Sequence, residues 1–271
     1  MAPLRVALLQ GPPGVPGAVA ESLAALERAA RTAVGRGARL LVTSELFLTG
    51  YAVGGRMAEL AEPAGGASEQ RVAEIAARHR IGIVYGAPER DGDAVLNTAR
   101  FVGADGRLLA AYRKTHLFGE YEREIFRPGA EPVVQAGFDG VRIGLLICYD
   151  VEFPETVRAH ALTGTELLVV PTALMRPYDF VAHTLVPARA YENGLHLAYV
   201  NRCGPEGRYD FAGLSCLAGP DGAVRARAGG GAELLVGDVD PAVLRAARAE
   251  TPYLSDRRPE LYGALTRRTT P

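Results

Sequence analysis

Short apolar runs alternate with longer amphipathic segments along this chain. The apolar runs are rich in β-branched residues and predict strands over residues 5–10, 40–43, 81–85, 97–102, 108–113, 141–148, 167–170, 197–201, 214–218, 224–227 and 233–238. The longer segments are rich in alanine, arginine and glutamate and predict helices over residues 18–34, 68–80, 153–162, 180–193 and 241–249. Aspartate–glycine pairs lie between strand-like runs and predict tight hairpin turns at residues 105–106 and 221–222.

This order of elements predicts a layered α/β domain. Strand–helix–strand units require parallel pairing, whereas the hairpins add antiparallel edges. The run from Ile143 to Ile147 is apolar at both alternating positions, so we expect this strand to be covered on both faces. No linker or repeat interrupts the pattern, which predicts a single domain over residues 1–271. From about Thr251 the chain contains Pro252 and Pro259 and is expected to form an extended arm lying on a partner, not a helix.

Composition narrows the class of protein. The chain has 271 residues, of which 48% are hydrophobic and 23% charged, as is usual for a globular protein with a substantial core. A formal net charge of −1 predicts binding to neither nucleic acid nor an anionic membrane surface. No apolar stretch approaches the roughly 20 residues of a membrane-spanning helix. The three cysteines lack metal-ligand spacing and predict free thiols in a cytoplasmic setting, with Cys203 and Cys216 in the core.

The basic residues are almost all arginine. Of 30 basic residues, Lys114 is the only lysine. A lysine ammonium is a compact charge with three movable donors, whereas the guanidinium of arginine is a rigid planar fork. A coding bias toward arginine would leave one lysine by chance, and a site that needs a point charge would retain it for its chemistry. The count alone leaves both interpretations open.

Three predicted strand ends each carry one reactive side chain: Glu45, Lys114 and Cys148. Ligands of open α/β sheets bind outside the carboxyl ends of strands. Partial burial there would raise the pKa of Glu45 toward the range of a general base, and the helix predicted from residue 153 would favour a thiolate at Cys148. Taken singly, the glutamate is more simply a surface acid and the cysteine a small buried hydrophobe. Three such residues at equivalent strand ends predict a reactive site.

Three segments resemble the nitrilase superfamily, the carbon–nitrogen hydrolases: residues 44–51 (SELFLTGY), 112–119 (YRKTHLFG) and 144–155 (GLLICYDVEFPE). The similarity spans nearly the whole chain, and it is strongest to amidases of the 5-aminopentanamidase type, through residues 83–86 (IVYG), 177–180 (PYDF) and 252–258 (PYLSDRR). The resemblance implies a four-layer αββα sandwich that pairs into an αββα–αββα homodimer or a higher homo-oligomer. It also implies that neither a metal nor an organic cofactor is required.

The resemblance extends to the catalytic residues. Glu45, Lys114 and Cys148 match the glutamate, lysine and cysteine of the family. Its supporting second glutamate lies eight residues beyond the lysine, which falls on Glu122, although Glu120 is close enough to leave that choice open. One departure is a serine at position 44, where many relatives carry proline. The histidine at position 116 suggests a cysteine–histidine dyad, but the family pattern leaves it a structural role.

The same resemblance suggests which residues meet the substrate. Tyr51, Tyr149 and Ala173 are expected to line the pocket. If the substrate is an ω-amino amide, an acid must meet its ammonium group, and the candidates are Glu120 and Asp179.

The predicted reaction is hydrolysis of a small aliphatic primary amide to a carboxylate and ammonia. Cys148 would attack the carbonyl carbon while Glu45 takes the thiol proton, passes it to the departing nitrogen and then activates water to hydrolyse the thioester. Lys114, beside the backbone N–H of Tyr149, would stabilise the oxyanion. Glu122 would hold Lys114 or the substrate amide in place.

Other functions predict other signatures. Relatives that hydrolyse nitriles or N-carbamoyl amines tend to carry tryptophan or asparagine after the cysteine, where this chain has Tyr149. A nitrilase, an N-carbamoyl-amine hydrolase and an ω-amidase remain the alternatives among enzymes. A catalytically silent scaffold would lack a member of the tetrad, and a thiol redox protein would need a resolving cysteine close to Cys148. Neither signature is present in the sequence.

Overall fold

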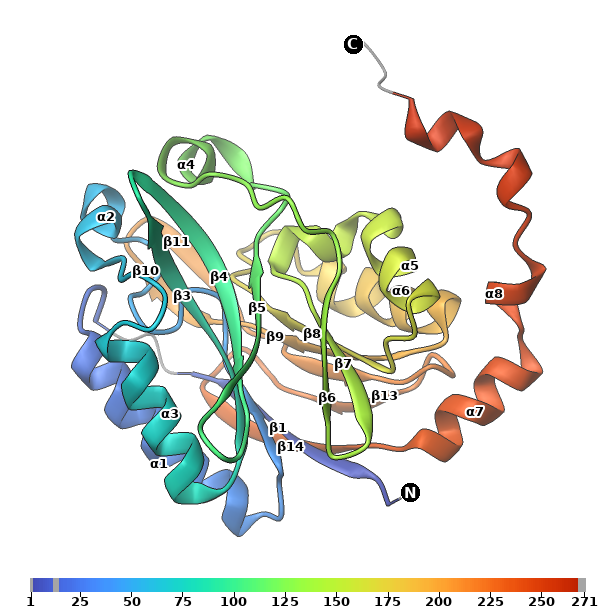
Figure 1. Cartoon of the computed structure of the whole chain (residues 1–271), viewed down its shortest axis with the longest axis horizontal. Helices are drawn as coiled ribbons and strands as arrows, with labels where there is room; N and C mark the ends of the chain where they lie inside the picture. Colours follow the sequence, from blue (N-terminus) through green and yellow to red (C-terminus); the bar gives the residue numbers. More distant parts are fainter. Residues whose placement is uncertain (1, 12–14, 268–271) are drawn as a thin grey trace.

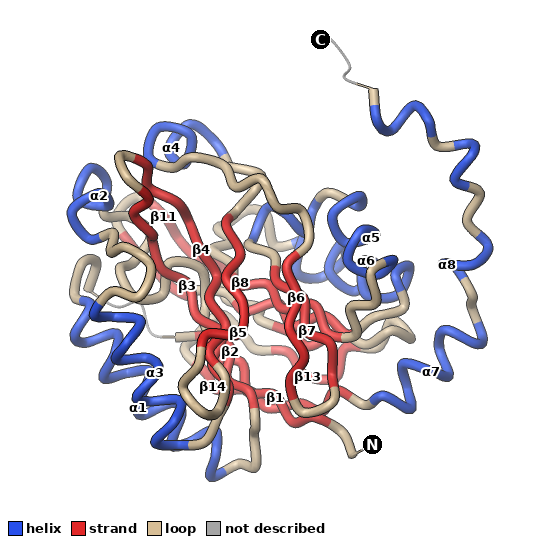
Figure 2. Tube along the Cα trace, in the orientation of Figure 1, coloured by secondary structure: helices blue, strands red, loops and turns tan. Residues whose placement is uncertain are grey.

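Two six-stranded sheets lie face to face in the computed structural model, which describes residues 2–11 and 15–267. Helices α1 (Val19–Gly35) and α3 (Ala67–His79) cover the outer face of the first sheet. Helices α5 (Pro154–Leu162) and α6 (Val186–Asn193) cover the outer face of the second (Figure 1). The four-layer αββα sandwich is therefore confirmed, with the strands forming its two central layers (Figure 2).

Both sheets have a parallel centre and antiparallel edges. The first has the order β14-β1-β2-β3-β4-β5, built from β1 (Leu4–Gln10), β2 (Leu40–Val42), β3 (Gly82–Asp91), β4 (Ala94–Val102), β5 (Leu108–Arg113) and β14 (Glu233–Val239). The second has the order β13-β12-β9-β8-β7-β6, built from β6 (Val134–Phe138), β7 (Val141–Leu145), β8 (Leu167–Pro171), β9 (His196–Val200), β12 (Cys216–Ala218) and β13 (Val224–Arg227). In the first sheet β1, β2 and β3 are parallel, and in the second β7, β8 and β9 are parallel.

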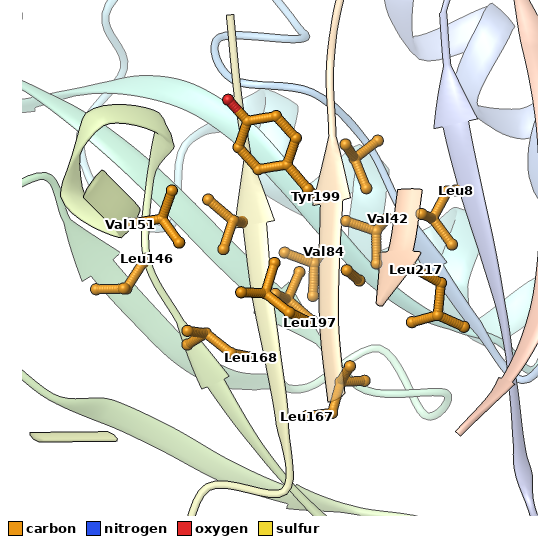
Figure 3. Close-up of a cluster of buried hydrophobic side chains, with 14 of the residues drawn as sticks. Leu8, Val42, Val84, Leu146, Val151, Leu167, Leu168, Leu197, Tyr199 and Leu217 are labelled. Atoms are coloured by element: carbon orange, nitrogen blue, oxygen red, sulfur yellow. The ribbon is translucent and has the colours of Figure 1, made fainter. Parts of the chain in front are cut away.

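Alternate residues of one strand belong to different hydrophobic layers. In β1, Val6 and Leu8 face the layer between the sheets, whereas Ala7 and Leu9 pack with residues of α1 and α3. Side chains of a strand point alternately to its two faces, so a strand covered on both faces must be apolar throughout. Figure 3 shows part of the central layer, where Val42 of the first sheet gathers with Leu197 of the second.

The second sheet is also covered on both faces, as the run of apolar residues in β7 predicts. Ile143 and Leu145 lie in the central layer. Gly144 faces α5 instead, and a Cβ at this position would lie 2.4 Å from Nδ1 of His160. Because glycine has no side chain, the helix packs directly against the strand backbone.

The sequence pattern missed the shorter elements. Each of these has too few residues for a clear period. They are strand β6, helices α2 (Met57–Leu60) and α4 (Gly119–Ile125), and the hairpin of β10 (Cys203–Glu206) and β11 (Tyr209–Ala212). The helix expected over residues 180–193 divides into a π-helical turn, Val181–Leu185, and α6. Both predicted aspartate–glycine turns join antiparallel strands, β4 to β5 and β12 to β13.

The C-terminal segment differs from the expected non-helical arm. After α7 (Pro241–Glu250) come α8 (Tyr253–Asp256) and two 3₁₀ turns, Pro259–Leu261 and Gly263–Thr266. Proline fits the first turn of a helix but not its interior, so these prolines begin short helical turns and keep them from joining. The segment leads away from the sandwich past α5 and α6 (Figure 1).

Over the described residues, no helix combines the length and the apolar character needed to cross a bilayer. In the same part of the chain, no group of three or more histidine, cysteine, aspartate or glutamate side chains is placed to hold a metal ion.

Candidate active site

Glu45, Lys114 and Glu122 form a buried, hydrogen-bonded group. Nζ of Lys114 donates to Oε1 of Glu45 and to Oε1 of Glu122, both at 2.7 Å. None of the three side chains is exposed to solvent. Lys114 directly follows β5 and Glu122 lies on α4, so the glutamate that contacts the lysine is Glu122, whereas Glu120 is exposed on the same helix.

The loop after β2 carries Glu45 across the neighbouring strand β3. At Gly86 of β3, a Cβ would lie 2.5 Å from the backbone nitrogen of Leu46, so only glycine allows this crossing. Leu46 has a φ of 48°, in the left-handed region. Strands β3 and β4 separate β2 from β5 in the sheet, and Asn97 of β4 connects the residues that follow them. Its side-chain Nδ2 donates to Oε1 of Glu45 at 2.7 Å, and its backbone carbonyl accepts from the backbone N–H of Lys114.

Cys148 lies on a strained turn beyond the end of β7. The prediction that it ends the strand is wrong, because β7 stops at Leu145 and Cys148 begins a 3₁₀ turn that runs to Glu152. The φ of Cys148 is 47°, which costs a non-glycine residue on the order of 1–2 kcal/mol. A conformation of this kind persists only where its surroundings hold it in place.

Asp150 provides that support. Its buried carboxylate accepts hydrogen bonds from the backbone N–H groups of Ile147 at 3.1 Å and His116 at 2.9 Å. It also accepts from the hydroxyls of Tyr112 at 3.0 Å and Thr115 at 2.9 Å. The carboxylate thus joins the turn that carries Cys148 to the segment that carries Lys114. The sequence pattern does not single out Asp150, although its place two residues after Cys148 is a signal for a supporting role.

His116 belongs to the same structural support. Its Nδ1 lies 2.9 Å from Oδ1 of Asp150, and its ring stacks on Phe153 with centroids 4.0 Å apart. It does not line the cavity at Cys148.

Burial and mutual charge set the protonation of the group. Burial raises the pKa of Glu45, an effect that the Lys114 ammonium only partly offsets. Burial alone would lower the pKa of Lys114, but the carboxylates of Glu122 and Glu45 raise it well above its ordinary value, so the ammonium stays charged. Burial, followed by the charge of Glu45, raises the pKa of Cys148 well above its ordinary value. The expected thiolate is therefore not favoured at rest.

One oxygen of Glu45 has no partner. Within the described residues, Oε2 of Glu45 is buried without a hydrogen bond, while Oε1 accepts from Lys114 and Asn97. A buried carboxylate oxygen without a donor costs free energy unless a proton or a ligand meets it.

A second set of contacts holds Glu122 and the neighbouring loop. The hydroxyl of Tyr51 donates to Oε1 of Glu122 at 2.8 Å, and the backbone N–H of Phe118 donates to Oε2 at 2.8 Å. Oε1 of Glu206 accepts from the backbone N–H groups of Tyr51 and Ala52, and Glu206 is ion-paired with Arg202. These supporting residues carry no motif that points to them in the sequence.

A cavity of about 180 Å³ opens beside Cys148. Its lining residues come from the loops after strands of both sheets and are Tyr51, Phe118, Cys148, Tyr149, Glu152, Ala173, Leu174, Met175, Tyr178 and Phe180. Tyr51, Tyr149 and Ala173 were expected in this lining. Glu120 and Asp179 are not part of it, and Nη1 of Arg176 donates to Asp179 at 2.8 Å.

Similarity to known proteins identifies the class of this chain as the carbon–nitrogen hydrolases. The profile of the family described as carbon-nitrogen hydrolase matches residues 5–249, and the chain belongs to that family. It is 45% identical over 267 residues to a Pseudomonas protegens protein described as a hydrolase in the pqqF 5′ region, covering 98% of this chain and 93% of that protein. It is 39% identical over 228 residues to an (R)-stereoselective amidase of a Pseudomonas species, covering 84% and 82%.

The fold is also similar to that of the amidase from Nesterenkonia sp. AN1. The TM-score is 0.87 at 38% sequence identity, covering 97% of each chain. That structure is of a mutant in which the acetamide moiety of fluoroacetamide is covalently added at the active-site cysteine. The resemblance to the amidase branch of the nitrilase superfamily is thus confirmed, and the chain is a carbon–nitrogen hydrolase with amidase relatives.

Proposed function

We propose that this protein is an amidase that hydrolyses small aliphatic primary amides through a thioester on Cys148. The observation that carries the proposal is the position of Cys148, which lines a cavity and is electrostatically coupled to the buried group of Glu45, Lys114 and Glu122. The cavity volume of about 180 Å³ suits a small aliphatic molecule.

The first step is attack of the Cys148 sulfur on the amide carbon. The thiol is neutral at rest, so it must lose its proton as the bond forms. Glu45 is the proposed acceptor, since its pKa is raised and its Oε2 lacks a partner among the described residues. The same carboxyl then delivers the proton to the departing nitrogen, which leaves as ammonia.

The second step is hydrolysis of the thioester. Glu45 is again a carboxylate once ammonia has left, and it removes a proton from the attacking water. Collapse of the tetrahedral intermediate breaks the carbon–sulfur bond and returns the proton to Cys148. The carboxylate product then leaves the cavity.

Lys114 is proposed to stabilise the negative oxygen of both tetrahedral intermediates. Its ammonium stays charged because two carboxylates contact it, and a charge fixed before the reaction needs no reorganisation during it. Glu122 and Asn97 are proposed to set its position, Glu122 by direct contact and Asn97 through the backbone.

The proposed function is tested by measuring ammonia release from butyramide and valeramide, with the matching nitriles as a comparison. Cys148→Ala should lower kcat by more than about 10³-fold, because it removes the nucleophile. Cys216→Ala is the matched control, since Cys216 is a buried thiol of the central hydrophobic layer. Mass spectrometry of the quenched enzyme should detect the acyl group on the peptide that contains Cys148. Undiminished turnover in Cys148→Ala, or faster turnover of the nitriles, would contradict the proposal.

We also propose that the chain forms a homodimer through the helices of the second sheet and the C-terminal segment. Large apolar side chains are exposed on α5, α6 and the segment beyond them: Leu162, Tyr191, Tyr253, Leu261 and Leu265. Exposed apolar side chains gathered on one face favour association. Sedimentation equilibrium should give twice the chain mass of 28.7 kDa, and a monomer would refute this.

A further inference from the structure

Glu152 is a carboxylate of the cavity that takes no part in the group around Lys114. It is the last residue of the 3₁₀ turn that begins at Cys148, and both residues line the cavity. Among the described lining residues Glu152 carries the only carboxylate, and no lysine, arginine or histidine lies there. A single negative charge therefore stands in a wall that is otherwise aromatic, aliphatic or thiol.

The Glu152 carboxylate has no partner within the described part of the chain. Two cations act on it through their charge, and both are engaged elsewhere: Lys114 contacts Glu45 and Glu122. The guanidinium of Arg189 donates to the backbone carbonyls of Val151 and Glu152 and to the carboxylate of Glu192. Burial raises the pKa of Glu152, with the charges of Lys114 and Arg189 acting in the opposite direction. A partly buried carboxylate without a partner is costly, and a cation placed against it would remove that cost.

The surrounding wall also suits a cation. The ring of Phe118 makes edge contacts with Tyr149 at 5.3 Å and with Tyr178 at 6.0 Å between centroids, and all three rings line the cavity. Aromatic faces attract ammonium groups and at the same time pack against methylene groups. A carboxylate next to such rings therefore fits a molecule with an aliphatic chain and a cationic end.

We propose that Glu152 binds the cationic end of the substrate, so that the preferred substrates are ω-ammonio amides whose amide carbon meets Cys148. This inference rests on the proposed amidase function. It assigns the role expected for Glu120 or Asp179 to a different residue. Neither of those acids lines the cavity, and Asp179 is already paired with Arg176.

The first test compares kcat/KM for 5-aminopentanamide and hexanamide, which have the same length and differ by an ammonium in place of a methyl group. The wild-type enzyme should prefer the charged amide by at least tenfold, and Glu152→Gln should reduce that ratio by at least tenfold. Glu155→Gln is the matched control, because Glu155 is exposed on α5 and outside the cavity. An unchanged ratio in Glu152→Gln would overturn the proposal. Loss of the preference for the charged amide in Glu120→Gln or Asp179→Asn would also overturn it.

A binding measurement separates this inference from the proposed function. Titration calorimetry of Cys148→Ala should show at least tenfold tighter binding of 5-aminopentanamide than of hexanamide, and the double variant C148A/E152Q should lose that difference. If the wild type hydrolyses neither amide, the proposed function fails, yet a preference that depends on Glu152 still supports the inference. Equal binding of the two amides to Cys148→Ala overturns the inference even where both are hydrolysed.

Discussion

The ammonium of Lys114 lies 2.7 Å from a carboxylate oxygen of Glu45, and neither side chain is exposed to solvent. Two charges removed from water are stable only when each is well paired, and removal of one member of such a pair typically costs about 3–5 kcal/mol. The second carboxylate, that of Glu122, completes the pairing and keeps the lysine protonated. The one lysine of the chain thus carries a fixed charge close enough to Cys148 to interact with it, and the pKa of Lys114 is raised above its ordinary value.

Lys114→Arg should lower kcat for butyramide by about 10²-fold or more, because a planar guanidinium cannot occupy the place of the ammonium between two carboxylates. Steady-state ammonia release measures the effect, and near-ultraviolet circular dichroism checks the fold. Arg123→Lys, an exposed change on α4, is the control and should leave kcat unaltered. Retention of most activity in Lys114→Arg would show that only charge is required at this position.

Glu45→Gln should separate thiol reactivity from catalysis. The charge of Glu45 raises the pKa of Cys148, so its removal should lower that pKa and speed alkylation by iodoacetamide at mildly alkaline pH. Amide turnover should fall by about 10²–10⁴-fold, because the proposed proton acceptor is lost. Glu124→Gln, exposed on α4, should change neither rate. Slower alkylation in Glu45→Gln would contradict the electrostatic assignment.

Asp150→Asn should destabilise the fold and the turn of Cys148 together. An amide can replace only part of the accepting capacity of a carboxylate that receives hydrogen bonds from Ile147, His116, Tyr112 and Thr115. We expect a loss of about 2–3 kcal/mol in the free energy of unfolding, measured with urea, and a lower kcat. Asp93→Asn, at an exposed position, serves as the control. Wild-type stability in Asp150→Asn would exclude this role.

Gly86→Ala should displace the loop of Glu45. The added methyl group would lie 2.5 Å from the backbone nitrogen of Leu46, so the loop must move. Overpacking of this kind costs about 1–3 kcal/mol, and we expect kcat to fall at least as strongly as stability. At Gly137, an added Cβ meets nothing within 4 Å, so Gly137→Ala is the control. Unaltered kcat in Gly86→Ala would show that the loop tolerates the shift.

Acid should weaken the fold through His160. Burial lowers the pKa of this imidazole from 6.5 to about 4. Between these two pH values the imidazole is therefore protonated in the unfolded chain and neutral in the folded chain. The stability that this neutral imidazole contributes is present above pH 6.5 and is lost as the pH falls toward about 4, with a total change of about 3 kcal/mol.

Urea unfolding at about pH 7 and about pH 4.5 measures the contribution of His160 to the free energy of unfolding. The difference in the free energy of unfolding between the two pH values should be smaller in His160→Gln than in the wild type, because the variant lacks the imidazole at position 160, whose protonation differs between the folded and unfolded chains in this window. An equal difference in both proteins would assign the acid sensitivity to other groups.

Much of the architecture was predictable because it depends on local patterns. The alternation of apolar residues predicted most strands, and the 3.6-residue period predicted α1, α3, α5 and α7 with small errors at their ends. Elements with few residues, such as α4 and β10, were missed because they form through contacts with distant segments. The end of β7 was misplaced for a related reason, since Leu146 and Ile147 are as apolar as the strand before them.

By itself, the sequence determined the layered fold and the family to which the chain belongs, because periodicity and residue type are local properties. It singled out Glu45, Lys114 and Cys148 as residues of one site. Only the tertiary structure decided which glutamate contacts Lys114, namely Glu122 and not Glu120. It also decided that Asp150 supports the turn that carries Cys148. Side-chain direction on α4 and contacts between segments 34 residues apart in the chain, such as His116 with Asp150, exist only after the sheets have packed.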